Sequence, residues 1–461
     1  MEERINIASD TVIEFLEQKR YSELKELLNE MLPADIALLF EDLDKAQLVA
    51  VFRLLTKDLG ADTFAYLDND SCMKLLDAIS DREIHDVFGR LFLDDAVDVI
   101  GEMPANVVTR ILNNSDPETR HLINEILKYP EDSAGSIMTV EYVNFTKNMS
   151  VGEAIAKLRR EGTGKETVYT CYVTENRKLI GIVDTSILLA SDDSEIIENI
   201  METNVVSVNT LEDREVVTRT FNKYGFIAVP IVDADMRLVG IVTVDDAIEV
   251  MQQENTEDIS IMAVMEPIEA GYFKTSVFSH AKKRIVWLLV LMISSTVTGM
   301  LLQKYESAIS VLPVLVSCIP MLMGTGGNSG TQAATMMIRG IALDEVRFSD
   351  IFRVVFKEFR ISIIVSAVLS AVNFARILIM YYAGWLGEIG GVSVFIVAFV
   401  VSAALMLVVI AAKFIGCTLP LLAHKVGLDP ALMASAVIST IVDAFAVVIY
   451  FNIAVYFIDI L

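Results

Sequence analysis

Asp443 is the only charged residue in an apolar run that extends from Pro430 to Ile458, and it lies near the middle of that run. A carboxylate at the centre of a bilayer costs roughly 2.5 to 3.5 kcal/mol on the most lenient scale, so intramembrane acids usually serve a function. An acid that is paired with a neighbouring helix, or protonated and inert, is the structural alternative. Asp443 therefore predicts a functional site inside the membrane.

A second apolar segment carries the sequence GTGGNSGTQ at residues 324–332. Glycines and polar side chains at bilayer depth expose backbone groups to lipid unless they face other protein or a wet cavity. Close packing of small residues between helices would explain the glycines. It does not explain Asn328, Thr331 and Gln332, whose side-chain oxygens suit a hydrated ion, so this segment is expected to line a pore.

Five apolar segments are long enough to cross a bilayer at about 1.5 Å per residue. They are Ile285–Leu302, Ser307–Ile338, Ile361–Gly387, Ile389–Ala412 and Pro430–Ile458. Basic residues concentrate before the first segment, between the second and third, and between the fourth and fifth, and such residues favour the cytoplasm. We expect a multi-pass protein of the cell membrane with a cytoplasmic amino-terminal half and a carboxyl terminus outside.

Charge divides the chain near residue 270. Residues 271–461 contain thirteen basic and nine acidic residues, whereas residues 1–270 contain 24 basic and 53 acidic residues. An acidic soluble half argues against nucleic-acid binding, which needs a positive surface, and suits cations. The four cysteines are far apart, so neither a disulfide framework nor a zinc site is predicted, and MEERINIASD at residues 1–10 lacks the features of a signal peptide.

Residues 33–127 repeat a short amphipathic unit, typical of a small superhelical solenoid. The units are expected to start near Pro33, Asp44, Lys57, Asn69, Asp81, Asp94, Pro104 and Asp116. Residues 137–250 then alternate strand-like and helical stretches in two similar copies, a pattern that resembles a pair of CBS domains. In the second copy Thr243 and Asp246 match the positions that serve phosphate and ribose in that family, whereas the first copy has Asp184 and Ile187 at the equivalent places. A folded module without ligand is the alternative for both copies.

The order of these parts resembles the MgtE-type magnesium channels, as do GTGGNSGTQ at 324–332, Arg339-Gly-Ile-Ala, Gly427-Leu-Asp429-Pro-Ala-Leu, Asp443 and YPEDSAGSIMT at 129–139. The resemblance implies a multidomain membrane protein with an all-α superhelical N domain, an α/β CBS-domain pair and an α-helical five-span transmembrane domain. The implied boundaries are 1–130 for the helical domain, 131–252 for the CBS pair, 253–283 for an acidic connecting helix and 284–461 for the membrane domain.

The resemblance also implies a homodimer in the lipid bilayer, with one pore on its two-fold axis. Asp443 of both copies would face one hydrated magnesium ion, which gives up its waters reluctantly. Gly326, Asn328, Thr331 and Gln332 would complete the lining, and Asp429 would attract the ion at the cytoplasmic mouth.

Regulatory magnesium sites are implied between the helical domain, the CBS pair and the connector. The matching acids are Asp94, Asp98, Asp213, Glu215, Asp246, Glu249, Glu254, Glu257 and Asp258. Without a cation these acids repel one another, so bound magnesium would hold the domains together and close the pore. Gly225 stands where the family can carry an acid, which puts one regulatory site in doubt, and each acid could instead be a solvated surface charge.

Three classes of function follow. The first is a magnesium-selective channel that is gated by cytoplasmic magnesium, with ATP as a candidate further ligand of the CBS pair. Its variant is a channel for manganese or cobalt. The second is a membrane-anchored receptor that senses nucleotides. An enzyme is not expected, because the sequence has no nucleophile elbow, no phosphate-binding Gly-Lys loop and no cluster of metal-binding histidines.

Overall fold

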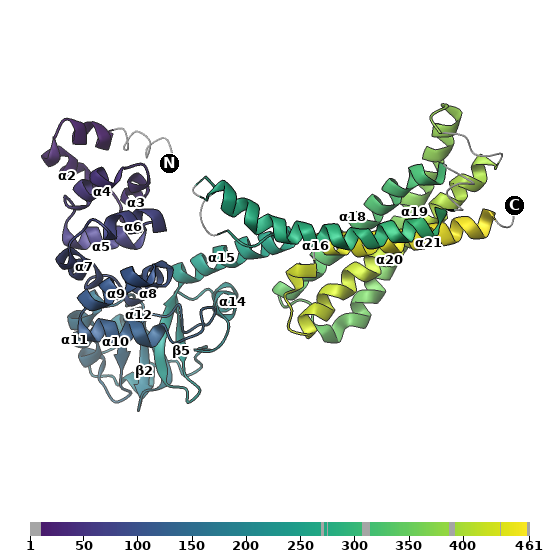
Figure 1. Ribbon diagram of the computed structural model, residues 1–461. Coiled ribbons are helices and arrows are strands. Elements are labelled where there is room, and N and C mark those ends of the chain that lie inside the picture. The colour runs from purple at the N-terminus through teal and green to yellow at the C-terminus, as the bar shows by residue number, and fades with distance from the viewer. Residues whose placement is uncertain are drawn as a thin grey trace. The chain divides into compact units, whose positions relative to one another are not determined.

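The computed structural model describes residues 11–268, 272–273, 275–306, 314–386, 392–433 and 435–458 (Figure 1). The chain forms two compact units, Met1–Gln252 and Gln253–Leu461. The predicted cytoplasmic amino terminus, residues 1–10, and the beginning of the second predicted membrane segment, residues 307–313, lie outside the described residues.

Short helices build the first part of the amino-terminal unit. They are α2 (Tyr21–Asn29), α3 (Pro33–Glu41), α4 (Lys45–Phe52), α5 (Lys57–Ala65), α6 (Asn69–Leu76), α7 (Asp81–Phe88), α8 (Leu93–Glu102), α9 (Ala105–Asn114) and α10 (Pro117–Ile126). Asp44 and Ser80 begin α4 and α7 through capping boxes with Gln47 and Glu83, which satisfy free backbone N–H groups at the helix starts. Each predicted start lies within one residue of an observed one, so the repeat prediction is confirmed.

Two similar α/β modules follow the short helices. The first contains β1 (Asn144–Phe145), α11 (Val151–Glu161), β2 (Thr170–Glu175), β3 (Lys178–Asp184) and α12 (Thr185–Ala190). After the single turn α13 (Ile197–Ile200), the second contains β4 (Val208–Asn209), α14 (Arg214–Tyr224), β5 (Ala228–Val232), β6 (Leu238–Thr243) and the start of α15 (Val244–Met262). Each sheet pairs its first two strands in parallel and its last two antiparallel, so the predicted duplication is confirmed.

The helical part and the second α/β module share one apolar core. Leu93 and Ile126 belong to the same buried cluster as Val217 and Val242. This common core fixes α8 within the same unit as the beginning of α15.

The connector differs from the single helix that was predicted for residues 253–283. Helix α15 begins directly after β6, passes residue 253 and ends at Met262. Val264 then has a φ of 57°, in the left-handed region, and Pro267 follows, so the helix cannot continue. The next helix, α16, begins at Val277, before the predicted boundary at residue 284.

The second unit is built from long helices, namely α16 (Val277–Lys304), α18 (Val314–Ala342), α19 (Ile351–Tyr382), α20 (Val394–Lys425) and α21 (Ser435–Ile458). Among the described residues, four helical stretches are long and apolar enough to cross a membrane: Val277–Lys304, Phe348–Tyr382, Val394–Lys425 and Pro430–Phe457. They match four of the five predicted segments, and the chain is therefore a multi-pass membrane protein.

Helix α18 corresponds to the remaining predicted segment. It has 29 residues, which is long enough to span a bilayer, but the run of glycines and polar residues makes it less apolar than the other four. It packs against α20 and α21, and much of its surface is buried there (Figure 1). A helix that is shielded by other helices can carry polar groups that lipid would not tolerate.

Candidate cation sites

The glycines of α18 allow its backbone to approach α20 and α21. A Cβ atom at Gly326 would come within 2.7 Å of Val408 on α20 and 3.0 Å of Val442 on α21. A Cβ at Gly416 of α20 would overlap the carbonyl oxygen of Gly330. Close packing between helices therefore explains why these residues are glycines, which was the alternative explanation considered from the sequence.

The polar residues of α18 lie on a different side of the helix from its packed glycines. Asn328 and Gln332 are exposed, and Thr331 is half-buried. Gly326, which was expected to contribute to a pore lining, is buried against α20 and α21, because it is the residue that lets the helices pack closely. Gly326, Gly327 and Gly330 of the motif therefore pack against the neighbouring helices, whereas Asn328 and Gln332 face outward from the helix bundle. The pore lining stays a prediction.

Helices α18 and α21 run antiparallel. On α21, the nearest residue to Gly326 is Val442, whereas the nearest residue to Gly330 is Ile438. Asp443 follows Val442 and is half-buried, so its Cα lies at the level of Gly326. Ser439, one helical turn before Asp443, contacts the position of Gly327, directly before Asn328. Among the described residues, no basic side chain forms an ion pair with Asp443.

Asp429 lies at the start of the short helix η3 (Pro430–Met433), ahead of α21. Its side chain accepts a hydrogen bond of 2.7 Å from the backbone N–H of Ala431. Within the same unit, burial and then repulsion from Asp429, Glu254 and Glu257 raise the pKa of Asp258 to about 6. Asp258 of the connector therefore lies close enough to Asp429 for their charges to interact.

A larger group of carboxylates forms inside the amino-terminal unit. We call it the acid cluster: Asp94, Asp95, Asp98, Glu166, Asp245, Asp246 and Glu249. Burial and the neighbouring charges of this group raise the pKa values of five of them, Asp94, Asp95, Asp98, Glu166 and Asp246. Its members come from α8, from the first turns of α15, and from the segment before β2. The structure thus brings together four of the predicted regulatory acids, Asp94, Asp98, Asp246 and Glu249.

Burial and mutual repulsion dominate the electrostatics of the acid cluster. Asp94 is 6% exposed, and burial followed by repulsion from Asp246 raises its pKa well above the usual range. The same two causes raise the pKa of Asp95 to about 7 and that of Glu166 to about 8. The pKa of Asp98 also rises to about 7, from burial and then repulsion by Glu249, although its side chain reaches solvent and water screens its charge more.

Three members of the acid cluster, Asp95, Glu166 and Asp245, were not predicted. Asp95 could have been found from the sequence, because it directly follows Asp94 in the first turn of α8. Glu166 lies far from the other acids in the sequence and only the fold brings it near them. One of its carboxylate oxygens, Oε2, is buried without a hydrogen-bond partner among the described residues.

Asp213 and Glu215 have local roles at the start of α14. Asp213 caps the helix by accepting a hydrogen bond from the N–H of Glu215, and the Glu215 carboxylate lies 3.2 Å from Arg219. No group of three or more acidic, histidine or cysteine side chains in the described part of the chain is arranged to hold a bare metal ion. A magnesium ion that keeps its waters needs more room than direct ligation, so separated carboxylates suit such an ion.

Gly225 ends α14 with a φ of 67°, in the left-handed region. Glycine adopts this conformation without steric cost, and Asp and Asn tolerate it better than other residues. The absence of an acid at this position therefore agrees with its backbone geometry.

Thr243 and Asp246, which were predicted to serve a nucleotide, contact each other. The Thr243 hydroxyl donates to Asp246 at 2.7 Å, and the Thr243 N–H lies 3.4 Å from the same carboxylate oxygen. Asp246 also belongs to the acid cluster, so it cannot serve a ribose and a regulatory cation independently. In the first module Asp184 accepts a hydrogen bond from Thr170 at 2.9 Å.

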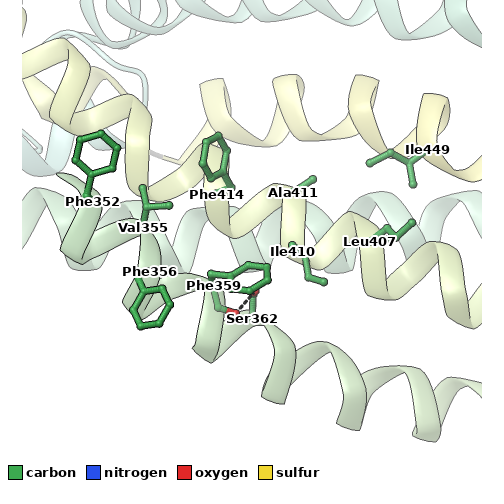
Figure 2. Close-up of a pocket in the computed structure, with 10 residues that line it drawn as sticks. All are labelled: Phe352, Val355, Phe356, Phe359, Ser362, Leu407, Ile410, Ala411, Phe414 and Ile449. Atoms are coloured by element: carbon green, nitrogen blue, oxygen red, sulfur yellow. Dashed lines mark hydrogen bonds between the residues drawn. The ribbon is translucent and has the colours of Figure 1, made fainter.

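The membrane unit also contains a groove of about 760 Å³ between α19, α20 and α21 (Figure 2). Its lining is aliphatic and aromatic apart from Ser362, whose hydroxyl donates to the backbone oxygen of Phe359 at 2.7 Å. A hydrated cation needs oxygen ligands or acceptors for its waters. This groove is therefore unsuited to an ion, in contrast to the region around Asn328 and Asp443.

Comparisons with known proteins agree with the arrangement of the chain. Residues 319–453 match the MgtE profile, described as a divalent cation transporter, residues 31–132 match the MgtE intracellular N domain, and residues 134–192 and 197–253 match CBS domains. The chain is 31% identical to the magnesium transporter MgtE of Thermus thermophilus, with 98% of each chain covered. It is 29% identical to the magnesium transporter MgtE of Bacillus subtilis, over 97% of this chain and 96% of that protein.

Two solved structures resemble the amino-terminal unit. The soluble part of a magnesium transporter has a TM-score of 0.51 and 28% identity, covering 54% of this chain and 99% of that one. The cytosolic domain of the Mg²⁺ channel MgtE in complex with ATP has a TM-score of 0.50 and 32% identity, covering 52% and 99%. With its domain order matched from end to end, the chain belongs to the MgtE family of divalent cation transporters.

Proposed function

We propose that this chain is a magnesium-selective channel of the cell membrane, gated by magnesium on its cytoplasmic side. One observation supports the pore more than any other: Gly326, Gly327 and Gly330 of α18 are buried against the neighbouring helices, while Asn328 and Gln332 are exposed and Asp443 of α21 is half-buried. The relatives at 31% and 29% identity are magnesium transporters. Membership of a transporter family also agrees with the expectation that the chain is not an enzyme.

A homodimer follows from the exposure of these polar groups. Lipid cannot satisfy Asn328, Gln332 or the carboxylate of Asp443, so this surface needs water or a second protein surface. A second copy across a two-fold axis supplies both, with a wet pore enclosed between two α18 and two α21 helices. Two Asp443 carboxylates then match the charge of one hydrated magnesium ion, and Asp429 attracts the ion at the cytoplasmic mouth.

The acid cluster provides the sensor in this proposal. Its ionised carboxylates repel one another, and this repulsion together with burial raises the pKa values of Asp95 and Glu166 far above those of free acids. Magnesium bound among them relieves the repulsion and holds α8 against α15. The connector acids Glu254, Glu257 and Asp258 respond in the same way beside Asp429, so high internal magnesium favours the closed channel.

ATP is the proposed ligand of the second CBS module. The cytosolic domain of a related channel, 32% identical, has been solved in complex with ATP. Thr243 and Asp246 stand at the start of α15, and ATP must release their mutual hydrogen bond to use them. Nucleotide and regulatory cation are therefore coupled through Asp246.

Magnesium flux into proteoliposomes at several internal magnesium concentrations tests transport and gating together. We expect flux from the wild type at low internal magnesium and a large decrease at high internal magnesium. Asp443→Asn should lose most of the flux while its folded helix content stays unchanged, and undiminished flux would remove Asp443 from the mechanism. Competition with manganese and cobalt determines selectivity, and nucleotide binding without any flux would instead favour the receptor.

A further inference from the structure

Two opposite charges meet inside the membrane unit, at a place that the sequence did not single out. Glu358 on α19 and Lys413 on α20 lie 3.8 Å apart between Oε2 and Nζ. Glu358 is 8% and Lys413 6% exposed, so neither reaches lipid or water freely. Ion pairs that are buried this deeply lose more hydration than their attraction returns unless other interactions compensate.

Apolar packing already holds the three helices together near this ion pair. One helical turn from it, an apolar cluster joins α18, α19 and α20 through Met337, Val354 and Cys417. Apolar side chains at positions 358 and 413 would extend this packing without the dehydration of two charges. A buried pair in a membrane protein therefore points to a function for the charges themselves.

Lys413 lies on the part of α20 that touches the proposed pore helix. The preceding residue, Ala412, places its carbonyl oxygen 3.2 Å from a Cβ built on Gly330 of α18. One turn later, Gly416 meets the backbone of the same Gly330 directly. No side chain lies between these backbones to absorb a displacement, so a shift of α20 moves α18 with it.

Gly330 is flanked in the sequence by the polar side chains of α18. Asn328 and Gln332 lie two residues to either side of it and are exposed, whereas Gly330 is buried. A displacement of α20 at Gly416 thus changes the position of these side chains relative to α21 and Asp443. Glu358 attracts Lys413 from α19, the other neighbour of this part of α20.

We propose that the Glu358–Lys413 pair is a positioning device that sets α18 through the Gly416–Gly330 contact and so determines which hydrated cation passes the pore. This inference rests on the proposed channel function, and it adds two specificity-determining residues that do not touch the ion. The pair acts by complementary charge, so its orientation can be reversed without loss.

The test compares Glu358→Gln, the apolar double variant E358L/K413M and the charge reversal E358K/K413E in proteoliposomes. The readouts are the ratio of magnesium to cobalt flux per folded protein, and the rate at which a water-soluble thiol reagent labels Asn328→Cys introduced into each background. The four native cysteines are buried, so each background without N328C gives the blank. Because loss of one partner of a buried pair is the most disruptive change, E358Q should alter the flux ratio and the labelling rate by roughly tenfold.

E358L/K413M is expected to fold and still to alter both readouts, and E358K/K413E to restore both to within about twofold of the wild type. Wild-type flux ratio and labelling in the apolar double variant would overturn the proposal, as would a folded charge reversal that behaves like E358Q. If the wild type carries no magnesium flux, the proposed function fails. The labelling rates then still decide whether the pair positions α18.

Discussion

Asp95→Asn tests the electrostatic basis of the acid cluster. Asp95 lies in the first turn of α8, is partly buried, and has its pKa raised to about 7 by burial and by Asp246, Asp245 and Glu249. When the pKa of an acid is higher in the folded than in the unfolded protein, the protein becomes less stable as the pH rises from the unfolded value, 3.8, to the folded value. Asparagine carries no charge at any pH and avoids this loss.

The magnitude follows from the pKa. One pKa unit corresponds to 1.36 kcal/mol, so a rise from 3.8 to about 7 corresponds to about 4 kcal/mol at full ionisation. Asp95 is partly exposed, and its neighbours share the protons, so roughly half of this amount is expected for one residue. Asp95→Asn should therefore be more stable than the wild type by about 2 kcal/mol at pH 8 and by about 0.5 kcal/mol at pH 4.5.

Thermal unfolding of a fragment of residues 1–262 in chelator measures this difference. Similar soluble parts of related proteins have been crystallised alone, and the amino-terminal unit has its own core. For a chain of this size, about 2 kcal/mol raises the Tm by roughly 4 to 8 °C. Adding magnesium should stabilise the wild type more than the variant and so reduce the difference between them.

Glu26→Gln is the matched control, because Glu26 is an exposed acid on α2 outside the acid cluster. It should leave the Tm unchanged at both pH values. Equal stability of Asp95→Asn and the wild type at pH 8 without metal would refute the proposed repulsion, and so would a difference that does not depend on pH.

Three further predictions concern other parts of the chain. Gly416→Ala should destabilise the membrane unit by roughly 1 to 3 kcal/mol in a detergent unfolding assay, because its Cβ would overlap the backbone of Gly330. Gly324→Ala is the control: its Cβ would meet open space, so the variant should be as stable as the wild type in the same assay. Burial raises the thiol pKa of Cys72 and of Cys171 to about 12, so neither should react with a thiol reagent at pH 8 until the soluble fragment unfolds. Thr243→Ala should weaken ATP binding in calorimetry while magnesium still stabilises the fragment; unchanged ATP affinity would place the nucleotide elsewhere.

The sequence was most informative where structure is local. Helix starts in the repeat were predictable because Asp44 and Ser80 supply side-chain acceptors to backbone N–H groups within three residues. The two α/β modules were predictable because strand and helix periodicity alternate twice. Asp443 was identifiable because one charge in a long apolar run is costly wherever the helix packs.

Tertiary contacts determined what the sequence could not predict. The glycine-rich motif predicted both packing and a pore. Only the neighbours of Gly326 and Gly330 show that these glycines pack, whereas the pore lining stays a prediction. Glu358 and Lys413 lay outside the predicted apolar segments, so their burial was not expected until α19 and α20 extended past them. Glu166 lies in the first α/β module and meets Asp246 only because the two modules pack together, through Tyr172 against Leu238 and Ile241.

The raised pKa values also imply that protons and magnesium compete for the same carboxylates. Between pH 8 and pH 6, Glu166, Asp95 and Asp98 pass through pKa values of about 8, 7 and 7 and take up protons, which relieves the repulsion that magnesium would otherwise relieve. The apparent affinity of the soluble fragment for magnesium should therefore decrease as the pH falls across this range. If gating uses these acids, mild acidification should close the channel at internal magnesium concentrations that leave it open at pH 8, and a flux that is independent of pH would separate the acid cluster from the gate.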